Sequence, residues 1–79
     1  MTKEEKDFLI TEAHPYIGHF LPDTETPNVG LVKYKFMGYL ENRRGNEYFP
    51  VAIIASEDGI QREEDLSYVV QLFKIASKL

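Results

Sequence analysis

The chain contains no cysteine and no tryptophan among its 79 residues. Without cysteine it can form neither a disulfide framework nor a thiolate metal site, the usual staples of small domains. Its longest apolar run, Val51–Ala55, falls far short of the roughly 20 residues that cross a bilayer. The N-terminal segment is also too acidic for a signal or transit peptide, and no apolar stretch follows it. We therefore expect no membrane association and a cytoplasmic location.

Both signs of charge are present, with an excess of acid. Nine Lys and Arg residues stand against 13 Asp and Glu residues, so the formal net charge is −4. The 43% hydrophobic and 28% charged fractions are typical of globular proteins rather than of disordered ones. The acidic balance argues against a general nucleic-acid binder, which usually carries a basic face. The length predicts one compact α+β domain over residues 1–79, and the initial methionine fits a complete chain.

A helix is predicted at the N-terminus. Thr2 followed three residues later by Glu5 fits a capping box, and Pro15 should end the helix near His14. Four of its residues share one side and give a short apolar stripe: Phe8, Leu9, Glu12 and Ala13. The apolar pattern then continues through residues that we expect to be packed: Tyr16, Ile17, Phe20 and Leu21. The proline-containing segment Pro22–Asn28 reads as a loop.

The middle of the chain predicts an antiparallel β-hairpin. Val29–Leu40 alternates with a period of two and is rich in β-branched and aromatic residues, and Gly38 within it suggests a bulge or a close backbone approach. After a polar turn, Tyr48–Ala55 forms the second strand, whose last five residues are apolar on both faces. Such a strand needs cover on both faces. Ile60–Arg62 is either a third strand or the lead into the next helix.

A C-terminal helix is predicted from about Glu63 to Lys78, with an acidic start and a basic end that suit the helix dipole. One apolar stripe should pack on the sheet: Leu66, Val69, Val70, Phe73 and Ala76. A second stripe lies beside it: Tyr68, Leu72, Ile75 and Leu79. Together they exceed the arc of little more than 100° that is typical of a surface helix. Either the N-terminal helix and Tyr16–Leu21 cover the second stripe, or a second protein does, and we predict a homodimer or higher oligomer through it.

Patterns for catalysis and metal binding are scarce. His14 and His19 do not share a helical face and show no metal-ligand spacing. The serines lie in no nucleophile elbow, and no glycine-rich phosphate loop is present. We therefore predict a non-enzymatic protein with no metal and no cofactor, and keep an enzyme with an unrecognised site as the third hypothesis.

Two charged groups are candidate binding surfaces. Lys33 and Lys35 share a predicted strand face with Met37 and Tyr39, and Arg43 and Arg44 follow at the turn. Cations beside an aromatic ring can hold a phosphate and stack a base, whereas the alternative is a soluble strand protected from edge pairing. The acidic residues are Glu57, Asp58, Glu63, Glu64 and Asp65. They either cap a helix in solvent, or engage a basic protein surface or mimic nucleic-acid phosphate.

The favoured function is that of a small acidic interaction protein, which inhibits or regulates by occupying a partner macromolecule. Small size and acidity fit an inhibitor that a phage or other mobile element directs against host defence, such as an anti-CRISPR protein acting in the host-cell cytosol. The main alternative is a binder of a small anionic ligand such as a nucleotide, or of nucleic-acid phosphate, through the basic hairpin.

Overall fold

The computed structural model describes residues 1–22 and 33–78, beginning with helix α1, Lys3–Ala13. The predicted capping box is confirmed, since the Thr2 hydroxyl accepts a hydrogen bond from the Glu5 N–H while the Thr2 N–H donates to the Glu5 carboxylate. The chain then tightens into a 3₁₀ turn, η1 (His14–Tyr16), at Pro15. The residues Asp23–Asn28 of the predicted loop, Val29–Val32 of the predicted strand and the terminal Leu79 lie outside the described residues.

Replacing Thr2 by alanine should lower the free energy of unfolding by about 1 kcal/mol, the usual value of an N-cap side chain.

The backbone and hydroxyl hydrogen bonds of Thr2 also lower the pKa of Glu5 below its ordinary 4.5, because they favour the carboxylate. A carboxyl group whose pKa is lower in the folded state stabilises the protein above the unfolded pKa, and this contribution is lost as pH falls through the folded pKa. The unfolding temperature of Glu5→Gln should therefore change less between pH 7 and pH 3 than that of the original chain. An equal change in both proteins would contradict the role of Glu5 in the capping box.

In the described part of the chain five strands follow α1, and they confirm the long hairpin. Strands β1 (Tyr34–Leu40) and β4 (Val51–Ser56) pair antiparallel, and the hairpin tip carries the short pair β2 (Arg43–Arg44) and β3 (Glu47–Tyr48). A third strand, β5 (Gln61–Asp65), pairs antiparallel with the other side of β4. The sheet order is therefore β1-β4-β5.

Helix α2 spans Leu66–Ser77, so the predicted start near Glu63 is wrong. Glu63 and Glu64 belong to β5, where their backbone pairs with β4. The helix begins only after Asp65, whose carboxylate accepts hydrogen bonds from the N–H and the hydroxyl of Ser67, both at 3.1 Å. The acidic run thus forms a strand and a helix cap rather than a first helical turn.

The predicted bulge in β1 is confirmed, and it overturns one face assignment. The register shifts between Phe36 and Gly38, which leaves Met37 as the extra residue. Because a one-residue shift exchanges the two faces, Tyr39 pairs with the buried Ala52 and packs against the core. Strict alternation along Val29–Leu40 would put Leu40 on the same face as Phe36, but Leu40 is 46% exposed.

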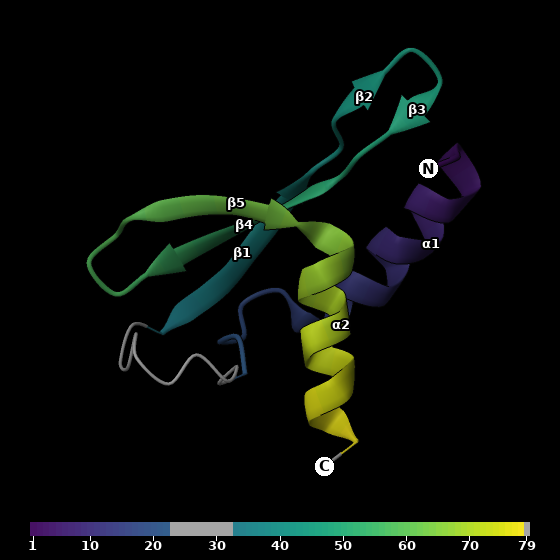
Figure 1. Cartoon of the computed structure of the whole chain (residues 1–79). Coiled ribbons are helices and arrows are strands. Elements are labelled where there is room, and N and C mark those ends of the chain that lie inside the picture. Colours follow the sequence, from purple (N-terminus) through teal and green to yellow (C-terminus); the bar gives the residue numbers. More distant parts are fainter. Residues whose placement is uncertain (23–32, 79) are drawn as a thin grey trace.

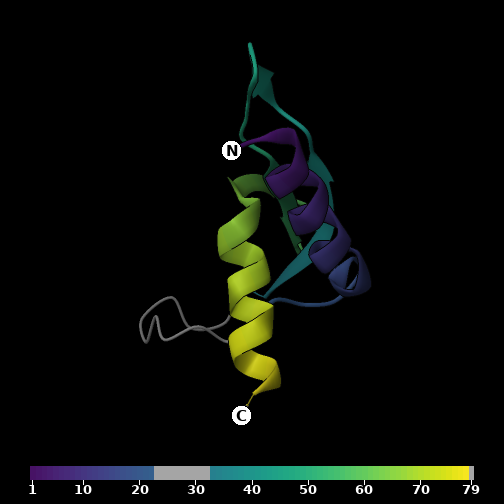
Figure 2. The ribbon, with the colours of Figure 1, turned by 90° about the vertical axis from the view of Figure 1, so that its right-hand side faces the viewer.

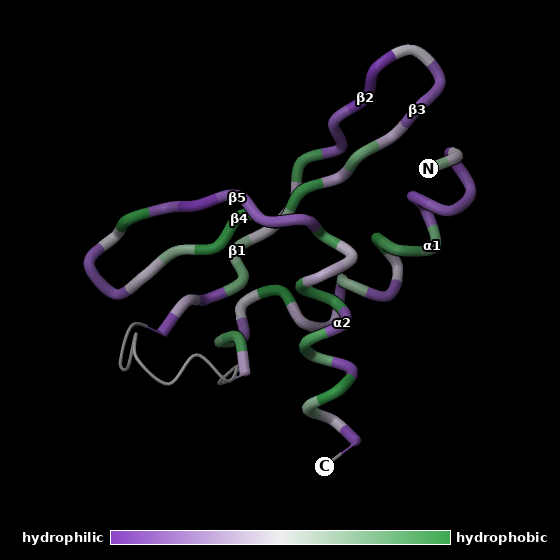
Figure 3. Tube along the Cα trace, in the orientation of Figure 1, coloured by the Kyte–Doolittle hydropathy of each residue, from purple (hydrophilic) through white to green (hydrophobic). Residues whose placement is uncertain are grey.

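The core lies between the sheet and the two helices, which lie side by side (Figure 2). Phe36, Leu66 and Val69 are completely buried, and the ring of Phe73 stacks on Tyr16 with their centroids 4.6 Å apart. A salt bridge between Lys74 and Glu12 joins the two helices. Figure 3 shows the contrast between the apolar β4 and the hydrophilic β5 beside it.

Two predicted core positions prove to be exposed. Phe8 of the N-terminal stripe is 67% exposed, and α1 instead turns Lys6, Leu9 and Ala13 inward. Phe20 is also exposed, although Tyr16, Ile17 and Leu21 around it pack against the core as predicted. The segment Gly18–Leu21 is held along β1 by backbone hydrogen bonds and by an isolated bridge from Phe20 to Lys35.

The hairpin tip projects beyond the sheet, next to the start of α1 (Figure 1). Backbone hydrogen bonds of 2.9 Å join Met1 and Tyr48 in both directions. The ammonium group of Lys6 lies 2.8 Å from the carboxylate of Asp7 and 2.6 Å from that of Glu41, and 4.8 Å from the centre of the Tyr48 ring. These carboxylates raise the pKa of Lys6 well above its ordinary value, and Lys6 in turn lowers the pKa of Asp7.

Candidate functional site

The four basic residues of the predicted anion site lie at the two ends of the long hairpin (Figure 1). Lys33 precedes β1 and Lys35 lies near its start, whereas Arg43 and Arg44 form β2 at the tip. The length of β1 between them, at about 3.3 Å per residue, separates the two pairs by roughly 20 Å. The structure therefore does not gather these four side chains around one phosphate.

Two of these cations lie over aromatic rings of their own chain. The ammonium group of Lys35 is 5.6 Å from the centre of the Phe20 ring, and the guanidinium group of Arg43 is 5.9 Å from the centre of the Tyr48 ring. Tyr39, the aromatic residue predicted to join Lys33 and Lys35, is on the opposite face of the sheet from Lys35. An arrangement of separated cation–π pairs stabilises the hairpin locally and gives no platform for a stacked base.

The second stripe of α2 lies on the side of the helix that faces away from the core. Tyr68 and Ile75 are both 51% exposed, and Leu72 between them is half-buried. The other stripe holds the buried residues Leu66, Val69, Val70 and Phe73. Neither α1 nor the segment Tyr16–Leu21 buries Tyr68 or Ile75, so this stripe remains a candidate interface; its last predicted member, Leu79, lies outside the described residues.

The five acidic residues divide into three settings. Glu57 and Asp58 lie in the exposed turn between β4 and β5. In β5, Glu63 and Asp65 pair with Ile53 and Val51, whereas Glu64 pairs with the buried Ala52 and so lies on the other face. The acidic patch is therefore spread over a turn and both faces of an edge strand.

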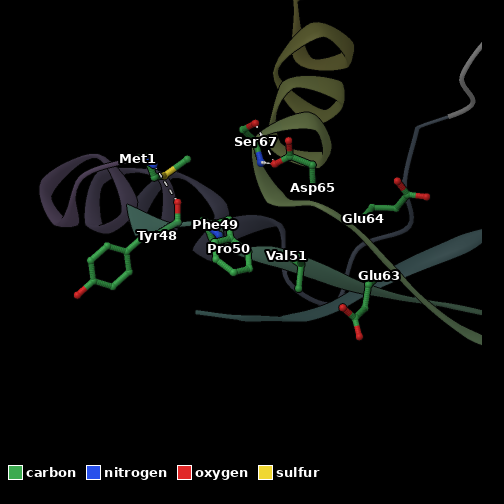
Figure 4. Close-up of a pocket in the computed structure, with 9 residues that line it drawn as sticks. All are labelled: Met1, Tyr48, Phe49, Pro50, Val51, Glu63, Glu64, Asp65 and Ser67. Atoms are coloured by element: carbon green, nitrogen blue, oxygen red, sulfur yellow. Dashed lines mark hydrogen bonds between the residues drawn. The ribbon is translucent and has the colours of Figure 1, made fainter. Parts of the chain in front are cut away.

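An open groove of about 460 Å³ lies where β4 begins and β5 ends (Figure 4). Met1, just before α1, and Ser67, in the first turn of α2, are part of its lining. Three acidic residues of β5 line it, Glu63, Glu64 and Asp65, with Glu63 and Glu64 pointing to opposite sides of the strand. The remaining lining is mostly apolar and includes the exposed ring of Phe49: Met1, Tyr48, Phe49, Pro50, Val51 and Ser67. Carboxylates beside an aromatic ring suit a cationic side chain better than a phosphate.

The face of the sheet opposite the helices, which we name the open face, was not foreseen as a site. The register gives this face three rows, each with one residue from β1, one from β4 and one from β5. The first row is Lys35, Ala55 and Gln61, and the second is Gly38, Ile53 and Glu63. The third is Leu40, Val51 and Asp65. The three β4 residues are half-buried, whereas their neighbours on the core face, Ala52, Ile54 and Ser56, are buried. Phe20 joins this face through its bridge to Lys35. The only signal in the sequence was the apolar character of both faces of β4.

Other chemistry is limited in the described part of the chain. Among residues 1–22 and 33–78, no three His, Asp or Glu side chains come together as a metal site, and none of the helices there is long and apolar enough to span a membrane. No family model, curated protein or solved structure matches this chain. Function is therefore inferred from the chain's own residues.

Proposed function

We propose that the protein is a small acidic, non-enzymatic interaction protein that inhibits or regulates a partner protein by occupying its surface. The observation that carries this proposal is the exposed stripe of α2, Tyr68, Leu72 and Ile75. These residues have the i, i+4, i+7 spacing with which an amphipathic helix fills an apolar groove. The other apolar stripe of the same helix supplies its packing on the core, whereas Tyr68 and Ile75 stay exposed.

The charges near this stripe indicate what the rim of the partner's groove should carry. Asp65 caps α2 three residues before Tyr68, and Glu64 precedes it in β5. Carboxylates at the start of the helix favour a partner whose apolar groove is bordered by Lys or Arg side chains. Small size and acidity further favour an inhibitor that a phage or other mobile element directs against host defence.

The test is a paired capture experiment from the source cell, with the protein as bait. The original chain is compared with Tyr68→Ser/Ile75→Ser, and with Phe8→Ser as a matched control, because Phe8 is an exposed aromatic residue of the other helix. We expect a protein that the original chain and the control retain but the double variant loses, with affinity for the purified partner at least tenfold weaker in the double variant. Capture that is equal for all three, or no capture at all, would overturn the proposal.

A further inference from the structure

The open face leaves half of β4 without the cover that its sequence requires. Ile53 is apolar like the buried Ile54 beside it, yet it lies on the face where no helix packs in the part of the chain that the structure describes. Leu40 and Phe20 add two exposed apolar side chains to the same face. A strand that is apolar on both faces is usually covered on both.

The two sides of the open face carry opposite charge. Lys35 lies on β1, Glu63 and Asp65 lie on β5, and the apolar residues of β4 lie between them. A two-fold rotation about an axis parallel to the strands places β1 of one copy over β5 of the other. Lys35 then faces the second copy's Gln61. The second copy's Glu63 is two residues further along β5, about 7 Å from Gln61, and is within reach of the Lys35 side chain. The surface is thus complementary to itself in charge, as an isologous interface must be.

The shape of the open face agrees with such a contact. A Cβ built on Gly38 would meet nothing within 4 Å, and Gly38 is not among the glycines with positive φ. Among the described residues, neither a positive φ nor close packing requires glycine at this position, which stands next to the bulge. A hollow of about 410 Å³ lies on the other side of Ile53, where it is lined by Gln61, Arg62 and Glu63. Glycine inside a strand often marks a close approach of another chain.

We propose that two copies of this chain associate face to face through the open face, with β1 of each over β5 of the other. Ile53 of each copy lies at the centre of the contact, and Lys35 with the second copy's Glu63 forms an ion pair at each side. Gly38 lies over the second copy's Glu63, and the absence of a side chain there leaves room for Glu63 to reach Lys35.

The expected strength follows from the size of this face. The width of the face is four segments at a spacing of about 4.8 Å: β5, β4, β1 and Gly18–Leu21. Its length is about five residues at about 3.4 Å each, so its area is roughly 300 Å². A standard stable interface buries about 800 Å² on each partner. The dimer should therefore be weak and concentration-dependent.

The test is sedimentation equilibrium of the full chain from about 5 to 500 µM. We expect the mass to rise with concentration toward twice the 9.2 kDa of one chain. Lys35→Glu and Glu63→Lys should each weaken association at least tenfold, and the double variant Lys35→Glu/Glu63→Lys should restore it because both ion pairs are re-formed with reversed sign. Gly38→Val should fill the room left for Glu63 and also weaken association. Circular dichroism confirms that each variant is folded.

Arg44→Glu is the matched control, because it makes the same charge change as Lys35→Glu at an exposed position of the hairpin tip. It should leave association unchanged. A chain that stays monomeric at 500 µM would overturn the proposal. So would a dimer that is unaffected by Lys35→Glu, Glu63→Lys and Gly38→Val but is lost in Tyr68→Ser/Ile75→Ser, since that dimer would use α2. Partner capture through α2 can succeed or fail independently of either result.

Discussion

Replacing Phe73 by alanine is expected to lower the free energy of unfolding by about 3–5 kcal/mol. The ring is stacked on Tyr16 and lies 6.2 Å from the ring of Phe36, so its removal opens a cavity where α2, β1 and the segment after α1 meet. A chain of this length has a total stability of roughly 4–12 kcal/mol. Thermal unfolding followed by circular dichroism should therefore show a variant that is largely unfolded at 37 °C or close to it.

Ile75→Ala is the matched control, because it shortens a large apolar side chain two residues away on the same helix. Ile75 is exposed, so we expect a change within about 0.5 kcal/mol. The contrast between the two variants tests the division of α2 into a packed stripe and an exposed one. Equal losses at both positions would contradict that division.

Local signals in the sequence were sufficient for the first helix and the long hairpin. The capping box at Thr2 and Glu5 and the proline at position 15 act within a few residues, so their effect on the backbone can be read directly. The period of two before the polar turn and the continuous apolar run after it likewise predict β1 and β4. In each case the residues that decide the structure are neighbours in the chain.

Strand β5 could not be assigned in the same way, because its partner decides its structure. Gln61–Asp65 holds four charged residues and no apolar one, which resembles the acidic first turn of a helix. It becomes a strand because β4 pairs with β1 on one side and offers its other edge to whatever follows. Charged residues also suit an edge strand, since they discourage pairing with another chain.

Two errors in face assignment have simple physical causes. The bulge at Met37 exchanges the faces of β1, so Tyr39 turns inward while Leu40 turns outward. On α1 the inner face includes Lys6, whose long apolar stem can be buried while its charge is paired, and this displaces Phe8 to the exposed side. Strict alternation therefore fails on β1, and the rule that aromatic residues lie inside and lysines outside fails on α1.

The candidate sites show the same limit. The sequence predicted the second stripe of α2, because helical spacing alone determines which of its residues share a side. It grouped Lys33 and Lys35 with Arg43 and Arg44 because they are near in the chain, but an extended strand keeps near residues far apart. The open face was missed because it needs residues from three strands whose register only the structure provides.

The two proposed surfaces would act together. The helices pack on the face of the sheet opposite the open face, so a dimer through the open face would leave the stripe of α2 exposed on both copies. Such a dimer would present two equivalent helices to its partner. If the partner is itself an oligomer, two-site attachment would raise the apparent affinity without any new contact. The weakness expected of the dimer would then make binding depend steeply on concentration.

Reversing the charge of Lys6 by Lys6→Glu is expected to destabilise the fold severely at neutral pH. The Lys6 side chain is only 8% exposed and lies between the carboxylates of Asp7 and Glu41. The variant would place a third carboxylate in this site, where burial and like charge both disfavour ionisation. The contact that holds the hairpin tip against α1 would then become repulsive, and thermal unfolding should begin at a much lower temperature.

The pH dependence of the same variant distinguishes this cause from simple loss of packing. Burial and the neighbouring carboxylates raise the pKa of the new carboxyl group in the folded state, so the folded state takes up a proton and its stability increases as pH falls. The unfolding temperature of Lys6→Glu should therefore rise between pH 7 and pH 5. Lys6→Met keeps an apolar stem without a charge, and its unfolding temperature should fall less than that of Lys6→Glu at pH 7.

Lys3→Glu is the matched control, since it makes the same charge change at an exposed position of the same helix. A glutamate near the start of a helix interacts favourably with the helix dipole, so this variant should retain nearly all of the original stability. The dipole acts in the same direction at position 6, and any loss in Lys6→Glu therefore arises in spite of it. The swap Lys6→Glu/Glu41→Lys should recover part of that loss by restoring one ion pair. If Lys6→Glu unfolds no more easily than Lys3→Glu, Lys6 does not hold the hairpin tip to α1.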